Sequence, residues 1–494
     1  MARAGSSVGP FASMLRQAMP RFETDDRFWE IEREGKRLRI RSGRLGEPGQ
    51  RMVHTAHFEA EAARQYDQRI DRKLDQGYRA ITSAREPVAE LEPELADAVL
   101  DALAPERLTA PDGVAALREA WSVLGDWLAT RGDVRGELIA IDETLTYVEG
   151  RGRDRLLARR DQLLAEWMPR WFGDFARLEG IDRPISLGWD HGFIAVARVG
   201  TEPNGLELTR YRLGLRDLIP VFEQLLDHPL TVALRQLRIG ELDPRSRRDL
   251  ARALPLLASA TRPALIRLEL GGVSRGAWRR DEYGVLVQKV VLARIGSLAP
   301  LARAHEWAPR LTALRIVGHE IRVLPALPQL RVLEIEVPFL FDELRTWLAS
   351  GPWPKLERLW LRSAHLHDPW SRPSDAPELD DILDTLEGAP LTELGLQGPT
   401  ALATLLRRPP LKLTELRLFN LGDSAVDLLL SAHDQLAKVD RIILEDTQIG
   451  RRWSELITRY RTRIRRCKGT FTAAQDNDGT DLRESIFDAP GWRP

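Results

Sequence analysis

Cysteine is nearly absent from this chain of 494 residues, in which Cys467 is the one example. A lone cysteine excludes an intrachain disulfide and a metal site built from several cysteines, so we expect a reducing compartment, the cytoplasm. Lysine is scarce as well, because seven of the 72 basic residues are lysine and all others are arginine. That bias is typical of a GC-rich bacterial genome.

Long apolar runs and net charge are also missing. No run of about 18 apolar residues occurs, so we expect no membrane span. The formal net charge is -1, so a surface that attracts nucleic acid has to be local. Gly9, Pro10 and Arg16 interrupt the first 20 residues, which predict a flexible arm rather than a signal peptide.

Catalytic motifs are absent too. The chain has no P-loop, no G-x-G-x-x-G, no H-E-x-x-H, no G-x-S-x-G and no EF-hand loop. Its nine histidines are scattered, and no third ligand accompanies the close pairs. We therefore expect no enzyme, no cofactor and no metal site. An enzyme with an irregular site leaves no local signature and stays a rival interpretation.

What is present begins with a small alternating module. The stretch from Phe28 to Ile40 alternates as two strands joined by a turn at Gly35. Three glycines then predict a longer turn before a third strand over residues 51–58. Residues 59–78 carry apolar side chains at helical spacing and predict a helix.

This order of elements resembles a WGR domain. The resemblance runs from Phe28 to Tyr78 through Phe-Trp-Glu-Ile, a basic strand, x-Gly-Arg-x-Gly-x-x-Gly-Gln, the helix and Lys-x-x-x-Gly-Tyr. WGR domains occur in poly(ADP-ribose) polymerases, where they contact DNA ends and neighbouring domains, and in many bacterial proteins. The name-giving triplet maps onto Ser42, Gly43 and Arg44, so serine stands where the family has tryptophan. The resemblance implies a docking module. Because the family tryptophan is missing here, the resemblance does not extend to recognition of DNA ends.

Cations gather on this module. From Arg33 to Arg51, seven arginine and lysine side chains stand against two glutamates, a local charge of +5 by count. Phosphate contact needs such a cluster. Three interpretations stay open: docking of DNA or RNA, docking of a protein or neighbouring domain, and a plain solvated hairpin. For the first, the predicted nucleic-acid-binding residues are Lys36, Arg37, Arg39, Arg41, Arg44, Gln50 and Arg51.

The middle of the chain, residues 83–180, reads as helical. Within it, Ala120 to Leu145 resembles the repeat-companion segment that precedes leucine-rich repeats in bacterial multidomain proteins, through its Asp-Trp-Leu, Gly-Asp and Arg-Gly-Glu motifs. The apolar spacing predicts two amphipathic helices, and Asp133 is placed to cap the second.

A ladder of L-x-x-L-x-L units follows, starting at positions 234, 265, 311, 330, 356, 391, 413 and 439. It resembles a leucine-rich-repeat solenoid, one strand and one return segment per unit. The usual corner asparagine is missing from these units, so we expect an irregular arc. The basic stretch 451–469 predicts a closing helix and strand, with a nucleic-acid arm as the alternative.

Strand alternation assigns a face to the residues between the leucines. If the leucines point into the core, their neighbours point out to the concave face. Mixed charge around large aromatics is typical of a protein-binding surface. The predicted protein-binding residues are Arg315, Arg358, Trp360, Arg362, Arg417 and Phe419. A loop covering Trp360 is the competing interpretation.

These patterns predict a multidomain α+β chain. Its predicted parts are a flexible arm (1–20), a WGR-like domain of sheet plus helix (21–82), a helical repeat-companion region (83–180), an irregular leucine-rich-repeat α/β solenoid (181–468) and a tail (469–494). The predicted function is non-catalytic recognition or scaffolding, in which the concave face binds a protein partner and the WGR-like module docks on nucleic acid or a neighbouring protein. The alternative is a nucleic-acid-binding regulator or sensor acting through that module. Partner identity and oligomeric state stay open.

Overall fold

The computed structural model divides into two compact units, Met1–Leu234 with Asp243–Arg245, and Arg235–Leu242 with Ser246–Pro494. It describes residues 21–24, 26–45, 47–81, 88–173, 176, 184–200, 218–242, 249–280, 286–322, 325, 327–337, 347–348, 353–363, 376–386, 388–408, 412–445, 449–450 and 452–467. The predicted arm 1–20 and the predicted tail 469–494 lie outside this part of the chain.

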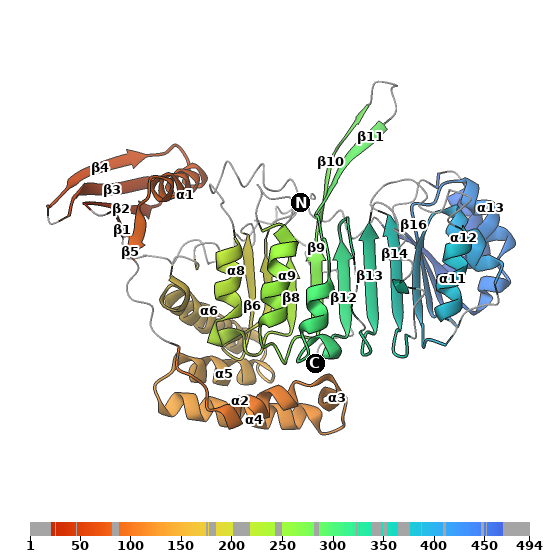
Figure 1. The fold of residues 1–494 in the computed structure, drawn as a ribbon, viewed down its shortest axis with the longest axis horizontal. Helices are drawn as coiled ribbons and strands as arrows, with labels where there is room; N and C mark the ends of the chain where they lie inside the picture. The colour runs from red at the N-terminus through yellow and green to blue at the C-terminus, as the bar shows by residue number, and fades with distance from the viewer. Residues whose placement is uncertain are drawn as a thin grey trace. The chain divides into compact units, whose positions relative to one another are not determined.

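The first unit begins with a small antiparallel sheet and one helix (Figure 1). The strands lie in the order β4-β3-β2-β1-β5. Their bounds, with the helix, are β1 Arg21–Glu23, β2 Arg27–Glu34, β3 Arg37–Arg44, β4 Gln50–Thr55, α1 Glu59–Asp75 and β5 Arg79–Ile81. The two strands of the alternating stretch, the third strand and the helix were predicted and are confirmed, whereas the short strands β1 and β5 were missed.

Alternation builds the core of this sheet. Trp29 and Ile31 on β2 and Ile40 on β3 point to one side, where they pack with Phe22 and with Ile70 of α1. Gly35 adopts the positive φ of 57° that the tight turn between β2 and β3 requires. The helix ends before Gly77, which also has a positive φ. This core is complete within the module.

A helical region and a hairpin follow in the same unit. The elements are α2 Pro93–Ala102, α3 Pro105–Leu108, α4 Gly113–Thr130, α5 Val134–Leu145, α6 Gly150–Phe172, β6 Ile185–Asp190, β7 Phe193–Val199, α8 Ile219–Leu226 and the short 3-10 helix Pro229–Thr231. Asp133 caps α5 as predicted, accepting from the Arg135 amide at 2.9 Å. A Cβ on Gly136 would lie 2.6 Å from the Ala129 nitrogen, so glycine permits the close approach of α4 and α5.

The second unit is built on parallel strands. Those of the sheet are β8 Gln236–Ile239, β9 Arg267–Gly271, β12 Ala313–Val317, β13 Val332–Val337, β14 Arg358–Ser363, β15 Glu393–Gln397, β16 Glu415–Phe419, β17 Arg441–Glu445 and β18 Ile464–Cys467. They pair side by side in chain order. A separate antiparallel pair, β10 Val273–Arg280 and β11 Leu286–Leu292, lies between β9 and β12 in the chain.

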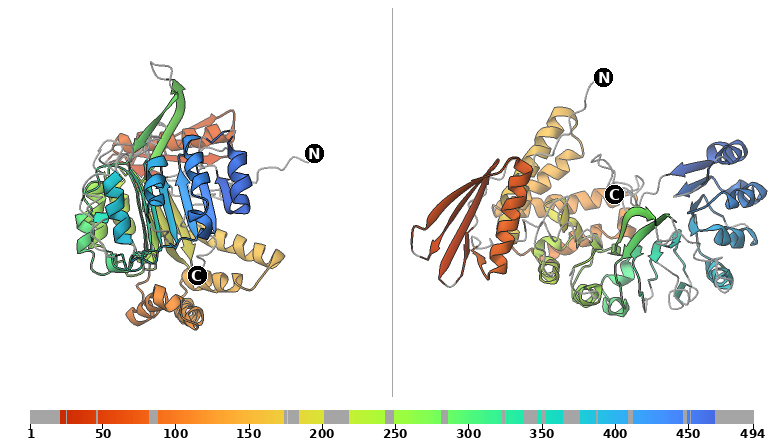
Figure 2. Two further views of the ribbon diagram at one scale, coloured as in Figure 1. Left: turned by 90° about the vertical axis from the view of Figure 1, so that its right-hand side faces the viewer. Right: turned by 90° about the horizontal axis from the view of Figure 1, so that it is seen from above.

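Helices line one side of these strands (Figure 2). They are α9 Asp249–Ser259, α11 Ala376–Leu386, α12 Pro399–Leu406, α13 Ser424–Ser431 and α14 Trp453–Tyr460, with 3-10 helices at Ala299–Arg303, Ala308–Arg310, Gln435–Lys438 and Arg461–Arg463. Every L-x-x-L-x-L unit contains one parallel strand, and the last two apolar residues of each unit are buried. The chain is thus a mixed α/β protein with a small antiparallel sheet near its N-terminus and a large sheet region with helices.

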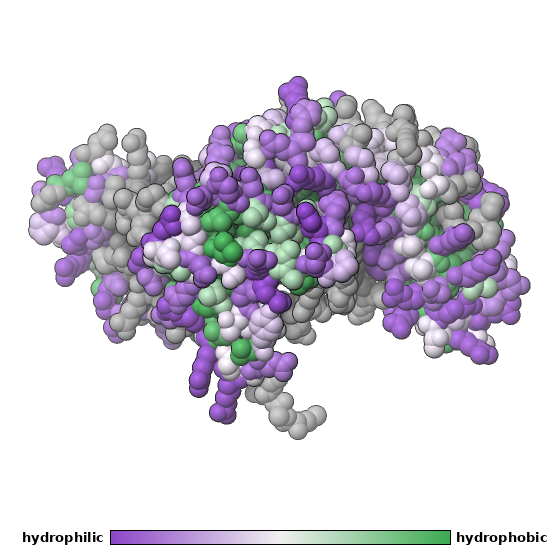
Figure 3. Space-filling model, turned by 90° about the horizontal axis from the view of Figure 1, so that it is seen from below, coloured by the Kyte–Doolittle hydropathy of each residue, from purple (hydrophilic) through white to green (hydrophobic). Residues whose placement is uncertain are grey.

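The coloured residues on one face of the molecule are mostly polar (Figure 3), as expected from the high content of charged residues. The face drawn in Figure 3 is mostly hydrophilic, with hydrophobic residues gathered in patches between. Within the described residues, no helix is long and apolar enough to cross a membrane.

Candidate functional site

The cations of the WGR region lie opposite glutamates that the sequence count left out. The pairing register sets Glu30 of β2 beside Arg41 of β3, and Glu32 beside Arg39. Arg41 donates two hydrogen bonds to the Glu30 carboxylate, of 2.6 and 2.7 Å. Arg39 lies 3.8 Å from Glu32, which the count omitted, and 2.6 Å from Glu34, which the count included. Two of the predicted phosphate ligands are therefore already neutralised.

Arg41 is the more firmly held of the two. Glu30 is buried, and the Arg41 guanidinium lies 5.2 Å from the centre of the Phe28 ring. The hydrogen bonds to Glu30 raise the pKa of Arg41 above its ordinary value. Arg39 and its partner are exposed, a setting in which ion pairs contribute about 0–1 kcal/mol. Arg41 thus has a structural role, whereas Arg39 is solvated but electrically compensated.

Four of the predicted cations remain uncompensated. Lys36, Arg37, Arg44 and Arg51 are exposed and form no ion pair with any residue that the structure describes. Lys36 and Arg37 lie where β3 begins and Arg44 where it ends, about 23 Å apart at the usual rise of a strand. The module therefore presents two separate positive groups rather than a continuous field of +5.

The second group lies where β3 ends and β4 begins, next to the position of the missing tryptophan. Ser42 pairs with Gln50 on one side and with Trp29 on the other. Arg51 lies next along β4 and pairs with Arg41, so alternation directs its side chain to the opposite face of the sheet from Ser42. Arg44 is two residues beyond Ser42 on β3. Gln50 and both arginines are exposed, whereas the Trp29 ring is buried in the core. Next to the position where the resemblance places an aromatic ring, this chain presents an arginine and an amide, which can bond phosphate oxygens but cannot stack on a terminal base as a ring does.

The predicted protein-binding face is covered, and the expectation of an exposed Trp360 was wrong. Trp360 is 5% exposed and Phe419 1%, and Arg315 and Arg362 are buried as well. Arg358 and Arg417 are partly buried, with side chains 15% and 17% exposed. These residues do share one face, as alternation predicts, but their long side chains pack on one another, so this face is a second core.

Charges alternate in sign along this buried face. Arg315 on β12 lies between Glu269 on β9, at 2.7 Å, and Glu334 on β13, at 3.4 Å. Burial raises the pKa of Glu334 to about 8, because Arg315 is shared with Glu269 and offsets only part of the desolvation. The row is thus a structural ladder of buried charges with one carboxyl group that titrates near neutral pH.

Trp360 lies in the middle of that face. The Arg417 guanidinium is 4.1 Å from its ring centre, and the Phe419 ring meets it edge-on at 6.0 Å. A Cβ on Gly395 would lie 2.8 Å from the Trp360 ring, so glycine leaves the space that the ring occupies. Trp360 therefore contributes to stability in this structure, and its ring is not offered to a partner.

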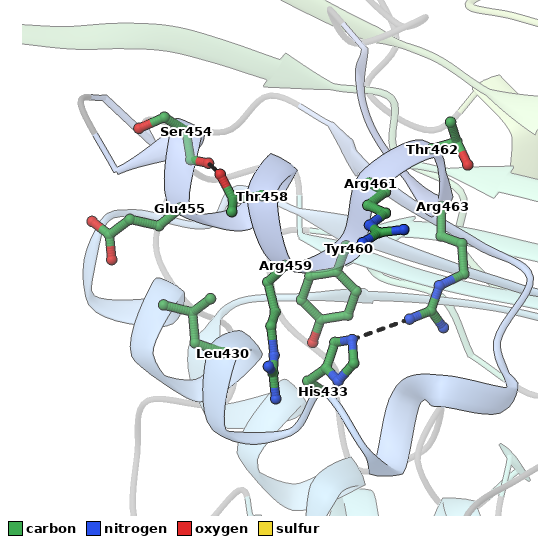
Figure 4. A pocket seen from close by; sticks show the side chains of 10 residues that line it. All are labelled: Leu430, His433, Ser454, Glu455, Thr458, Arg459, Tyr460, Arg461, Thr462 and Arg463. Atoms are coloured by element: carbon green, nitrogen blue, oxygen red, sulfur yellow. Dashed lines mark hydrogen bonds between the residues drawn. The ribbon is translucent and has the colours of Figure 1, made fainter.

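An open depression of about 980 Å³ lies beside α14 (Figure 4). Three of its polar side chains bond within the protein: Tyr460 donates to the Leu429 carbonyl, and Arg463 donates to the Ala437 carbonyl at 2.9 Å and lies 3.3 Å from the Nε2 atom of His433. The helix and strand predicted within the basic stretch 451–469 are confirmed as α14 and β18. These hydrogen bonds all run within the protein, so they do not indicate a ligand in the depression.

One cluster of carboxylate and histidine groups among the described residues has the spacing of a metal site, but an arginine occupies it. Ligand atoms of Asp142, Asp190 and His191 lie within 4.8 Å of one another. Asp142 is already bound by Arg160, at 2.9 Å, which places a positive charge where a cation would bind. Sequence spacing could not reveal this group, because α5 and the β6–β7 turn are some 50 residues apart in the chain.

Comparison with known proteins identifies one part of the chain. Residues 14–85 match the WGR domain, which confirms the predicted module. A crystal structure of a protein from Bacteroides fragilis aligns over 91% of this chain and 96% of that one, with 15% identity and a TM-score of 0.38, which is too low to establish a shared fold. No curated protein matches the chain.

Proposed function

We propose that this chain is a non-catalytic nucleic-acid-binding regulator that docks through its WGR domain. The observation that carries the proposal is the set of exposed side chains where β3 ends and β4 begins, with Arg44 and Gln50 on the face of Ser42 and Arg51 on the opposite face. These side chains are exposed, and the two arginines are uncompensated within the described residues. Arginines and an amide can bond phosphate oxygens without reading sequence. We therefore expect recognition of the nucleic-acid backbone rather than of a stacked terminal base.

We further propose that the large sheet region is an irregular leucine-rich-repeat scaffold that carries this domain. In support, each L-x-x-L-x-L unit contributes one strand, and successive units pair in register. A protein partner on the face of Trp360 is now the weaker candidate, because that face is buried. The observation therefore favours the regulator over the protein-binding scaffold.

The test compares two arginines on the same face of the sheet. Arg51→Ala removes an uncompensated charge, whereas Arg39→Ala removes a charge that Glu34 neutralises. We expect the first to weaken binding of the full chain to duplex DNA or RNA and to lower the salt slope by about 1. The second should leave the slope nearly unchanged. The measurement is fluorescence anisotropy with labelled oligonucleotides at several salt concentrations.

Equal effects of Arg39→Ala and Arg51→Ala would show that an ion pair with a glutamate does not prevent an arginine from contacting phosphate. No binding to duplex DNA, single-stranded DNA or RNA at low salt would remove the proposed function, and a protein partner on the same module would replace it.

A further inference from the structure

The turn between β6 and β7 carries an unusual residue. Asp190 pairs with Phe193, which leaves His191 and Gly192 as a two-residue turn. Both have positive φ, 52° and 75°, as a type I′ turn requires. Asparagine followed by glycine is the usual choice there, and histidine at positive φ is less common. Histidine tolerates this conformation, and the contacts of its side chain give a further reason for it at this position.

The His191 side chain is held on every side. Its Nδ1 atom lies 2.6 Å from an Asp190 oxygen and its Nε2 atom 2.9 Å from a Glu143 oxygen. Its ring stacks on Trp121 of α4, with centres 4.7 Å apart and planes 8° apart. Its backbone N–H donates to Asp142 of α5 at 2.7 Å. The turn is thus attached to α4 and α5 through one residue.

These contacts determine where the protons lie. An ionised carboxylate only accepts hydrogen bonds, so a ring nitrogen facing one has to carry a proton. Both nitrogens of His191 face carboxylates, and the ring is therefore a positively charged imidazolium. Three carboxylates surround it, and two arginines bind those carboxylates: Arg160 of α6 lies 2.9 Å from Asp142, and Arg118 of α4 lies 3.5 Å from Glu143.

The charges of the six residues named here are equal in number and opposite in sign. Asp142, Glu143 and Asp190 give three negative charges, and protonated His191, Arg118 and Arg160 give three positive ones. Arg160 also donates to the Trp189 carbonyl at 2.6 Å, which ties α6 to the same hairpin. A bound divalent cation would upset this balance, whereas loss of the His191 proton would leave two carboxylates facing a ring that can donate to only one.

We propose that His191 is a proton-operated latch that holds the β6–β7 turn against α4 and α5 and releases it when the imidazolium is lost. The sequence Asp190-His191-Gly192 supplies the turn geometry through glycine and the charge through histidine. Glu143 of α5 supplies the acceptor at a distance in the chain.

The direction of the pH dependence follows from two groups. Burial lowers the pKa of His191, but bonds to Asp190 and Glu143 and the charge of Asp142 outweigh it and raise the pKa above 6.5. Burial likewise raises the pKa of Asp142. A raised pKa in the folded state means that the contribution to stability is complete below the unfolded value and is lost as the pH rises through the folded one. Docking of the turn should therefore weaken as the solution becomes alkaline.

The first experiment reports the proton directly. In the full chain with ¹⁵N-labelled histidine, the His191 signal, assigned by its loss in His191→Asn, should show two protonated ring nitrogens at about pH 6.5 and remain so above it, where an ordinary histidine has lost its charge. A neutral ring at that pH would overturn the proposal.

The second experiment reports the latch. Hydrogen-exchange protection of the amides of residues 189–193 should fall by up to about tenfold per pH unit between 6.5 and the raised pKa of His191. His191→Asn keeps a residue suited to the turn and removes the charge, so its protection should not vary with pH in that range. His305→Asn, at an exposed histidine, is the control and should behave as the unaltered chain.

Two outcomes of the second experiment would overturn the latch. One is a pH dependence that persists in His191→Asn. The other is stoichiometric binding of Zn²⁺ that depends on His191 and restores protection at alkaline pH, which would assign the group to a metal instead.

Discussion

Replacement of Trp360 by alanine should strongly destabilise the second unit. The ring is 5% exposed, lies 4.1 Å from the Arg417 guanidinium and meets the Phe419 ring edge-on at 6.0 Å. Truncating a buried tryptophan costs about 3–5 kcal/mol through lost burial and the cavity that remains. The cation–π and aromatic contacts place the expected loss toward the upper end of that range.

Urea unfolding of the full chain can measure this loss if the second unit is followed separately, for example by exchange of amides in β14 to β16. Leu361→Ala, on the opposite face of the same strand, should cost about 2–5 kcal/mol, because that side chain is also buried. Ile457→Ala is the control, since Ile457 is 45% exposed. A loss below about 1 kcal/mol for Trp360→Ala, with a normal loss for Leu361→Ala, would refute a buried role for this face.

Three further changes test other parts of the structure. The stability of the second unit should fall as the pH rises from 4.5 to about 8, because Glu334 keeps its proton to a higher pH in the folded state than in the unfolded state. The dependence of stability on pH, measured by urea unfolding, should be weaker in Glu334→Gln. An unchanged dependence in that variant would assign the effect to another group. Arg41→Ala should lower the thermal midpoint of the WGR domain, because Glu30 loses a two-bond partner while buried, and an unchanged midpoint in calorimetry would contradict that role. Gly395→Ala should destabilise the second unit by about 1–3 kcal/mol, because the Trp360 ring has to move, and a neutral effect on urea unfolding would show that the ring relaxes freely.

The spacing of apolar residues was sufficient to predict the longer strands and helices, because each of them buries a regular set of apolar side chains. The alternation from Phe28 to Ile40 became β2 and much of β3, and the leucine units became parallel strands whose paired leucines are buried. The strands β1 and β5 were missed because three residues are too few to show a period. The cap at Asp133 was predictable because an N-cap depends on local sequence.

The candidate site was less predictable because charge compensation acts across strands. A count along the chain from Arg33 omits Glu30 and Glu32, yet the antiparallel register places both beside arginines of β3. The position of the turn at Gly35 fixes which residues of β2 and β3 pair. Pairing the two strands residue by residue from that turn would therefore have revealed both contacts. No such signal existed for Glu143 and His191, which meet only through tertiary packing.

Burial of the Trp360 face was also beyond the sequence. Alternation correctly assigned these residues to the side away from the leucines, but it cannot tell a solvated face from a covered one. Long arginine, glutamate and tryptophan side chains on neighbouring strands cover one another when opposite charges stand side by side, as Glu269, Arg315 and Glu334 do.

The salt dependence of nucleic-acid binding by the full chain tests the central claim most directly. If the uncompensated cations of the WGR domain contact two to four phosphates, affinity for a duplex should fall roughly tenfold to hundredfold between about 50 and 200 mM salt. Arg44→Ala with Arg51→Ala should reduce the slope by about 2. Binding that is insensitive to salt, or a slope that the double substitution leaves unchanged, would contradict phosphate docking where β3 ends and β4 begins.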